Sequence, residues 1–343
     1  MLGRRLLTLG LFFAAVANPV FAAQAPASGS SPKSTEAQQA ARRKALVAFQ
    51  RDLVSVIAPQ AEPLPLLGGA LLARPLADQP DFNSFHSLIE RAAQAPNAGP
   101  EVNWTRLTDC DAKADACPNP DALSQLVVQA PDNAAVWLLK LGLDSHDDKG
   151  AAAREDLAKA AAAKLYDDYT GASLKALATT VTLLPPPPAV INPLSATGAS
   201  GVQVMMVFGL AGTQPQPGLQ ATARLCEGAG DDKSIKDDCL KLGKVLEWSS
   251  SPLARSLGLH LREVLADDPA QQEDARRARR NLVWQVQNFG QLSARAQGDL
   301  GLAQHLLTLA RSGGTEMSLL LTALHDFNIS VDAPADWEPN KAG

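Results

Sequence analysis

The chain contains 343 residues with a mass of 36.1 kDa, and 46% of them are hydrophobic, so it can bury a substantial core. Aromatic residues make up only 5%, and the Ala- and Leu-rich remainder favours packed helices over a sandwich or a barrel. The formal net charge of −5 gives no general electrostatic reason to bind nucleic acid, and the composition excludes collagen-like, coiled-coil and multi-span membrane proteins.

The first 22 residues have the pattern of a secretory signal peptide. Arg4 and Arg5 precede an apolar stretch over 6–17, and the small residue Ala22 ends a cleavage motif before Ala23. A helix that spans a membrane needs about 20 apolar residues, so we expect cleavage rather than anchoring; a buried N-terminal helix is the alternative. We therefore predict an exported, soluble protein with no transmembrane anchor in its mature form, periplasmic if the host is a Gram-negative bacterium.

Apolar residues recur at intervals of three and four along most of the chain, which predicts helices. In the first part these helices lie near 36–58, 64–74, 82–95, 120–129 and 166–184, with a helix pair over 131–163. In the second part they lie near 200–213, 217–227, 232–248, 252–266, 270–290, 297–312 and 314–326. No stretch shows the sustained alternation of a β-strand, so the predicted fold class is all-α.

The mature chain is expected to consist of two helical parts around a proline-rich break. Residues 23–35 are small and polar, which is typical of a flexible linker before an N-terminal helical half, 36–184. Four consecutive prolines open the segment 185–200, which either separates two domains or forms a long loop within one superhelix. A C-terminal helical half, 201–327, and a polar tail, 328–343, complete the predicted organisation.

The segment 131–163 has the pattern of an antiparallel helix pair. Its first helix carries Trp137, Leu141 and Gly142, and small residues allow the helices to approach closely. The segment resembles one tetratricopeptide unit, with W-x3-L-G where the family pattern has W-x2-L-G. The resemblance implies antiparallel helix pairs stacked as a TPR-like superhelix, or solenoid, that binds proteins. Trp137 is expected to be buried where the helix pairs pack.

The four cysteines are expected to form two local disulfides. An exported chain meets an oxidising compartment, and proximity in the sequence favours the pairs Cys110–Cys117 and Cys226–Cys239. Neither spacing matches a zinc site, and a redox-active pair is more often C-x-x-C. Metal binding and free thiols are the alternatives.

No motif predicts a catalytic, cofactor or metal site. His86 with Glu90, and His260 with Glu263, lie about one helical turn apart, as an acid–base pair could, but such spacings are common on helix surfaces. The Asp-rich segment 144–148 is typical of a helix turn and lacks the spacing of a calcium loop. Nucleophile-elbow, P-loop and dinucleotide-binding patterns are missing, which favours a protein that is not an enzyme and needs no cofactor.

The densest cluster of charge consists of the arginines Arg276, Arg277, Arg279 and Arg280. One interpretation is a solvated helix face, balanced by the acidic residues between 267 and 274. The other is a patch that binds an acidic partner or anionic lipid head groups.

Together these features favour an exported helical-repeat protein that acts as a protein-binding or scaffold module of the cell envelope. The expected partner is a protein or peptide and not a nucleic acid. One alternative is a periplasmic immunity protein that neutralises a secreted toxin. A second alternative is an envelope hydrolase whose active site is built from residues distant in the sequence.

Overall fold

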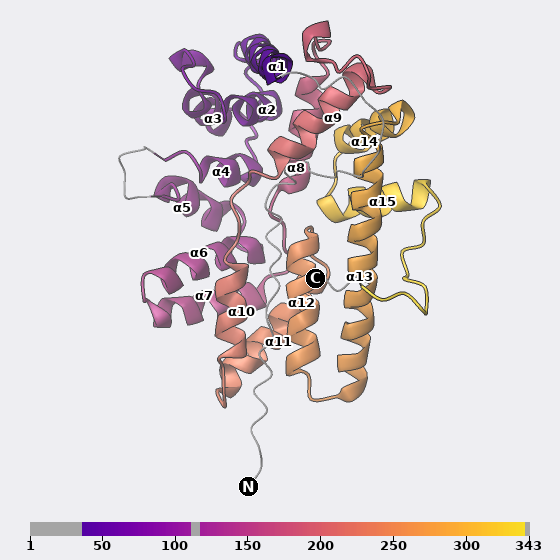
Figure 1. Cartoon of the computed structure of the whole chain (residues 1–343). Helices are drawn as coiled ribbons and strands as arrows, with labels where there is room; N and C mark the ends of the chain where they lie inside the picture. Colours follow the sequence, from indigo (N-terminus) through magenta and orange to yellow (C-terminus); the bar gives the residue numbers. More distant parts are fainter. Residues whose placement is uncertain (1–35, 111–116, 340–343) are drawn as a thin grey trace. The chain divides into compact units, whose positions relative to one another are not determined.

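The computed structural model describes residues 36–110 and 117–339, which are almost entirely helices and their connections (Figure 1). These ranges contain fifteen α-helices, two short 3-10 helices and no strand, so the predicted all-α fold class is confirmed. None of the helices in the described ranges is both long and apolar enough to cross a membrane.

The predicted signal peptide and its cleavage site between Ala22 and Ala23 lie outside the described residues, as does the predicted linker 23–35. The chain divides into two compact units, 1–40 and 41–343. The first unit contributes only the beginning of α1 (Glu36–Ile57) to the described residues.

The helices follow one another with short connections. The earlier ones are α2 (Pro63–Ala73), η1 (Asp81–Asn83), α3 (Phe85–Gln94), α4 (Pro100–Arg106), α5 (Pro120–Gln129), α6 (Ala134–His146), α7 (Gly150–Ala162) and α8 (Thr170–Val181). The later ones are η2 (Pro188–Val190), α9 (Gly198–Ala211), α10 (Leu219–Glu227), α11 (Lys233–Glu247), α12 (Pro252–Leu265), α13 (Pro269–Arg295), α14 (Leu300–Ser312) and α15 (Glu316–Asp326).

The structure differs from the predicted helices at a few positions. Helix α4 is absent from the prediction because its seven residues are too short to show a period. The helix predicted over 166–184 begins only at Thr170, because Tyr169 adopts a left-handed φ of 56° that interrupts a helix. Helix α13 is longer than the predicted 270–290 and continues to Arg295.

Short polar side chains begin many of these helices. Ser84 caps α3 and Asn133 caps α6, each by accepting a hydrogen bond from a backbone amide of the first turn. Thr315 and Ser318 form a reciprocal capping box at the start of α15. These caps satisfy amides that the helix itself leaves unpaired.

Two clusters of buried apolar side chains form the core of the unit 41–343. The first draws mainly on α1–α3, α8, α9, α14 and α15, and the second on α4–α7 and α10–α12. Helix α8 packs on α14, and α6 packs on α10, so both clusters contain residues from both sides of the proline-rich segment 185–200.

Small residues bring α6 and α10 into close contact. A Cβ atom on Gly142 would lie 2.9 Å from Cα of Gly218, the residue before α10, whose amide donates to the carbonyl oxygen of Leu138 at 3.0 Å. The close approach expected at Gly142 is therefore made with α10. Trp137 is 8% exposed, as predicted for a core residue, and its Nε1 donates to the carbonyl oxygen of Pro131 at 2.7 Å.

Both predicted cysteine pairs are confirmed as pairs at disulfide distance. The Cα–Cα distance is 5.5 Å for Cys110–Cys117 and 5.8 Å for Cys226–Cys239, and no cysteine of the described ranges is free. The second bridge is buried in the second core cluster and links the end of α10 to the middle of α11. Two disulfides are compatible with an oxidising compartment.

Candidate functional site

Three of the four clustered arginines on α13 are engaged in ion pairs. Arg276 contacts Glu263 at 3.3 Å, and Arg279 contacts the other oxygen of the same carboxylate at 2.9 Å. Arg277 contacts Asp274 at 2.7 Å. These carboxylates neutralise much of the positive charge that the sequence concentrates here, so this part of the cluster offers little unpaired charge to a partner.

Arg280 has a different environment from the other three. Its guanidinium donates to the carbonyl oxygens of Pro334 and Trp337, the second at 2.9 Å, and lies 5.9 Å from the centre of the Trp337 ring. No carboxylate of the described residues forms an ion pair with it. Arg280 therefore binds the backbone of the chain's own C-terminal end.

The C-terminal segment, defined as residues 330–337, lies within the predicted polar tail and is bound to α13 by side-chain hydrogen bonds. The side chain of Asn281 donates to the Asp332 carboxylate at 2.7 Å and accepts a bond from the backbone amide of Ala333 at 3.1 Å. Asn281 thus contacts the segment as both donor and acceptor, which fixes the direction in which the segment passes.

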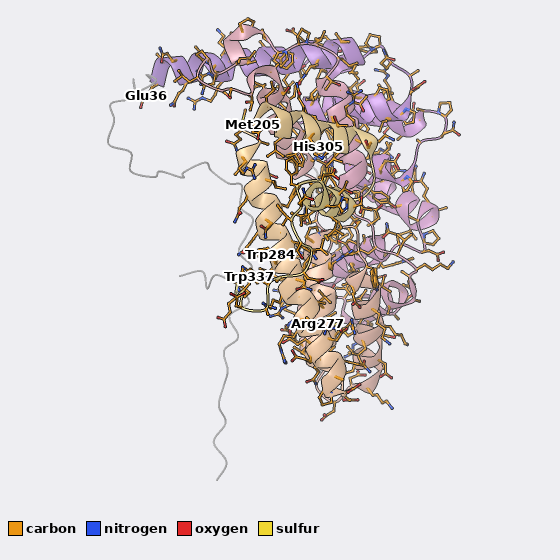
Figure 2. The ribbon with its side chains drawn as sticks, turned by 90° about the vertical axis from the view of Figure 1, so that its right-hand side faces the viewer. Glu36, Met205, Arg277, Trp284, His305 and Trp337 are labelled. Carbon is orange, nitrogen blue, oxygen red and sulfur yellow. A yellow bond between two sulfur atoms is a disulfide. The ribbon has the colours of Figure 1, made fainter. Side chains whose placement is uncertain are left out.

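Two further side chains of α13 donate to carbonyl oxygens of this segment. Trp284 Nε1 donates to Ser330 at 2.8 Å, and Gln285 Nε2 donates to Val331 at 2.8 Å. The ring of Trp284 also packs edge-on against that of Trp337, with 5.4 Å between ring centres (Figure 2). Aromatic pairs of this geometry contribute about 0.5–1.5 kcal/mol beyond the apolar area they bury.

We call Arg280, Asn281, Trp284 and Gln285 the α13 stripe. They lie on one side of α13, because residues four apart in a helix are neighbours on its surface. Sequence analysis identified only Arg280 among them. The available signal was the pair of tryptophans, 284 and 337, of which Trp337 lies in a polar part of the chain.

The histidine–glutamate pairs suggested by spacing are not formed. His86 is 75% exposed and lies 2.9 Å from Asp109, while Glu90 pairs with Arg106. Acid–base chemistry would need the two side chains to meet, but His86 contacts Asp109 and Glu90 pairs separately with Arg106.

His260 likewise has a partner other than the residue one turn away. Its Nε2 lies 3.0 Å from Glu227, and its Nδ1 lies 3.3 Å from a guanidinium nitrogen of Arg279. Glu263 binds arginines of α13. Glu227, His260, Arg279 and Glu263 thus form a network of polar and charged side chains between helices.

A buried acidic junction, not recognised in the sequence, lies at the beginning of α15. The amide of Ser250 donates to the carbonyl oxygen of Tyr166 at 3.1 Å, and the amide of Met317 donates to that of Ser250 at 2.9 Å. Burial, and then the nearby Asp168 carboxylate, raises the pKa of Glu316 to about 7, and burial also raises the pKa of Asp168.

Both carboxyl groups of this acidic junction have a raised pKa, as acid–base groups often do, but the Asp168 side chain has little access to solvent. Asp168 is buried and accepts a hydrogen bond from the amide of Thr170 at 3.3 Å. The Tyr166 hydroxyl is fully enclosed and has no hydrogen-bond partner among the described residues. The junction joins three chain segments, and its role is therefore structural.

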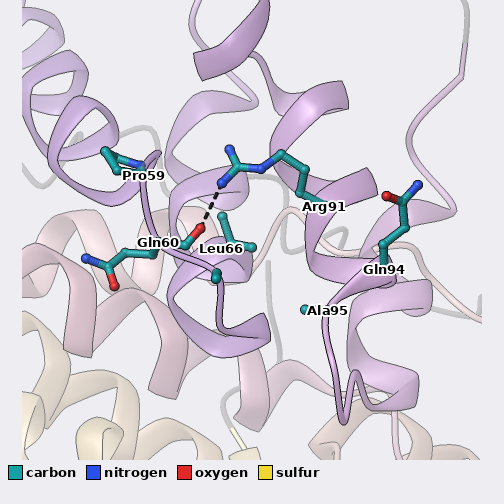
Figure 3. A pocket seen from close by; sticks show the side chains of 7 residues that line it. Pro59, Gln60, Leu66, Arg91, Gln94 and Ala95 are labelled. Carbon is teal, nitrogen blue, oxygen red and sulfur yellow. Dashed lines mark hydrogen bonds between the residues drawn. The ribbon is translucent and has the colours of Figure 1, made fainter.

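A shallow cavity of about 260 Å³ lies between the end of α1, α2 and α3 (Figure 3). Arg91 at its edge donates to the carbonyl oxygen of Gln60 at 2.7 Å and stacks over the Phe82 ring at 4.5 Å. Gln94 donates to Glu90 at 3.0 Å. Because these polar side chains bind groups of the chain itself, they do not converge on a ligand.

No group of His, Cys, Asp and Glu side chains in the described ranges is arranged to hold a metal ion. Comparison with models of known families, with curated proteins and with solved structures finds no match to this chain. Its function is therefore inferred from the geometry of the described residues.

Proposed function

We propose that the protein is an exported helical scaffold that binds a protein partner at the cell envelope. The observation that carries this proposal is the α13 stripe, which holds the non-helical segment 330–337 against a helix. Peptide segments bound along a preformed surface are a common mode of protein recognition.

The composition of the α13 stripe supports this proposal. Tryptophan and arginine are the residues that most often dominate the binding energy of protein interfaces, and the stripe contains Trp284 and Arg280. A helix held by packing and ion pairs is a rigid platform for such residues, so little conformational entropy is lost when a partner binds.

Two finer parts of the proposal rest on the sequence. The resemblance of 131–163 to a tetratricopeptide unit supports a TPR-like stacking of helix pairs, an architecture suited to binding proteins. The signal-peptide pattern supports export, with a periplasmic location in a Gram-negative host. The paired cysteines are consistent with that compartment.

Affinity capture from an envelope extract tests the proposal. The full mature chain is compared with Trp284→Ala and with Trp248→Ala, which removes a 79% exposed tryptophan outside the α13 stripe. We expect at least one protein whose capture falls by about fivefold or more with Trp284→Ala and is unchanged with Trp248→Ala, as for the loss of an interface anchor.

Two results would contradict the proposal. One is that no protein is enriched over a heat-denatured sample of the same chain. The other is that every enriched protein is captured equally by the wild type and by Trp284→Ala. Circular dichroism of each variant shows whether its helices are intact.

A further inference from the structure

We infer that the α13 stripe binds an acidic, non-helical segment of the protein partner, and that the chain's own C-terminal segment occupies the stripe as an internal competitor. This inference rests on the proposed function, because it names the kind of partner segment that the same surface takes. It makes the C-terminal segment a strap that a partner must displace.

The contacts of the stripe are largely independent of the side chains of the bound segment. Arg280, Trp284 and Gln285 all donate to backbone carbonyl oxygens of the C-terminal segment. Every residue has such an oxygen, so another chain that follows the same path satisfies the same donors. The stripe therefore recognises backbone carbonyl groups on that path.

Charge and one aromatic side chain restrict which segments fit. Residues 330–339 contain Asp332, Asp336 and Glu338 and no basic residue. On α13, Asn281 donates to the carboxylate of Asp332, and Arg280 has no carboxylate partner among the described residues. An acidic segment with a tryptophan matches this surface, whereas a basic segment would face the Arg280 guanidinium, which has no carboxylate partner among the described residues.

The C-terminal segment is held weakly enough to be displaced. Six of its eight residues are exposed, and only Ala333 and Trp337 are half-buried. Six hydrogen bonds and one ring contact oppose the conformational entropy of eight ordered residues. Little apolar surface is buried in compensation, so the bound form of the segment outweighs the released form by only about tenfold.

A labelled peptide with the sequence of residues 330–339, SVDAPADWEP, tests this inference by fluorescence anisotropy against the full chain. In Trp337→Ala the chain's own strap loses its ring contact with Trp284, so the stripe becomes available. We expect this variant to bind the peptide at least about tenfold more tightly than the wild type, because a tethered competitor acts at a high effective concentration.

Three controls identify the surface and the chemistry. The double variant Trp284→Ala/Trp337→Ala should lose binding, and Trp248→Ala should behave as the wild type. A peptide with Asp332, Asp336 and Glu338 replaced by lysine should bind Trp337→Ala at least about tenfold more weakly than the acidic peptide.

The inference is overturned if Trp337→Ala does not bind the peptide at up to about 1 mM, if the wild type binds it equally well, or if the lysine peptide binds as tightly as the acidic one.

Failure of this inference is distinguishable from failure of the proposed function. If a partner is captured in a Trp284-dependent manner while the acidic peptide does not bind, the scaffold function stands and the strap is rejected. If the peptide binds as expected and no partner is captured, the strap stands and the scaffold function is rejected.

Discussion

Replacing Glu316 by glutamine should make the stability of the protein less sensitive to pH. Glu316 is the first residue of α15 and lies in the buried acidic junction, near Asp168. Burial, and then the charge of Asp168, raises its pKa from an ordinary value near 4.5 to about 7. Glutamine keeps the shape of the side chain and stays neutral at every pH.

The direction of the effect follows from the raised pKa. Below about pH 4.5 the side chain is protonated in both folded and unfolded protein, and no stability is lost. As the pH rises from about 4.5 through about 7, the unfolded chain releases its proton first, and the folded state loses stability relative to it. Above about pH 7 the whole loss is present.

The magnitude follows from the difference in pKa. A pKa raised from 4.5 to about 7 corresponds to at most about 3.4 kcal/mol, since each unit is worth about 1.4 kcal/mol. Glu316 is partly exposed, and water reduces such an effect, so we expect about 1–3 kcal/mol. The variant's gain in free energy of unfolding over the wild type should therefore depend on pH. We expect this gain to be about 1–3 kcal/mol larger at pH 8 than at pH 4.5.

Urea unfolding followed by circular dichroism at both pH values measures this difference. Glu155→Gln is the matched control, because Glu155 is exposed and its hydrogen bond with Lys159 lowers its pKa, so the effect has the opposite sign. The reasoning is wrong if the free energies of unfolding of Glu316→Gln and the wild type differ by the same amount at both pH values. It is also wrong if the variant is less stable than the wild type at pH 8.

Four other predictions concern the fold and its processing. Replacing Cys226 and Cys239 by serine should lower the free energy of unfolding by about 3 kcal/mol in urea titrations, because the bridge closes a loop with a sequence separation of 13. Gly218→Ala should cost at least about 2 kcal/mol in the same assay, because its Cβ would clash with the backbone of α6; wild-type stability would refute that contact. Trp137→Ala should cost about 3–5 kcal/mol if burial dominates its role, and a change below about 1 kcal/mol would contradict a core position. N-terminal sequencing of the exported protein should begin at Ala23, and an intact Met1 there would reject the signal peptide.

Local patterns were enough to predict most of the secondary structure. The apolar spacing of a helix depends only on residues within about four helical turns of one another. It can therefore be recognised without knowing what the helix packs against. The approximate positions of most helices, the burial of Trp137 and the two cysteine pairs followed in this way. Helix α4 and the beginning of α8 did not, because one is too short for a period and the other depends on the conformation of Tyr169.

The candidate site was predictable only in part. The arginine cluster is visible in the sequence, but its ion pairs with Glu263 are not, because Glu263 belongs to the preceding helix and its orientation depends on how α12 packs on α13. The same holds for the strap, whose contacts join residues 46 to 57 positions apart. No short-range spacing reports such a contact.

The sequence by itself determined that this protein is helical and that its cysteines pair locally, because helix periodicity and short loops depend on neighbouring residues. The tertiary structure alone decided that α10 closes on Gly142, that Glu316 lies half-buried near Asp168, and that residues 330–337 lie on α13. These contacts depend on which helix faces meet. That choice is set by the packing of the whole core, in which segments far apart in the chain exclude water together.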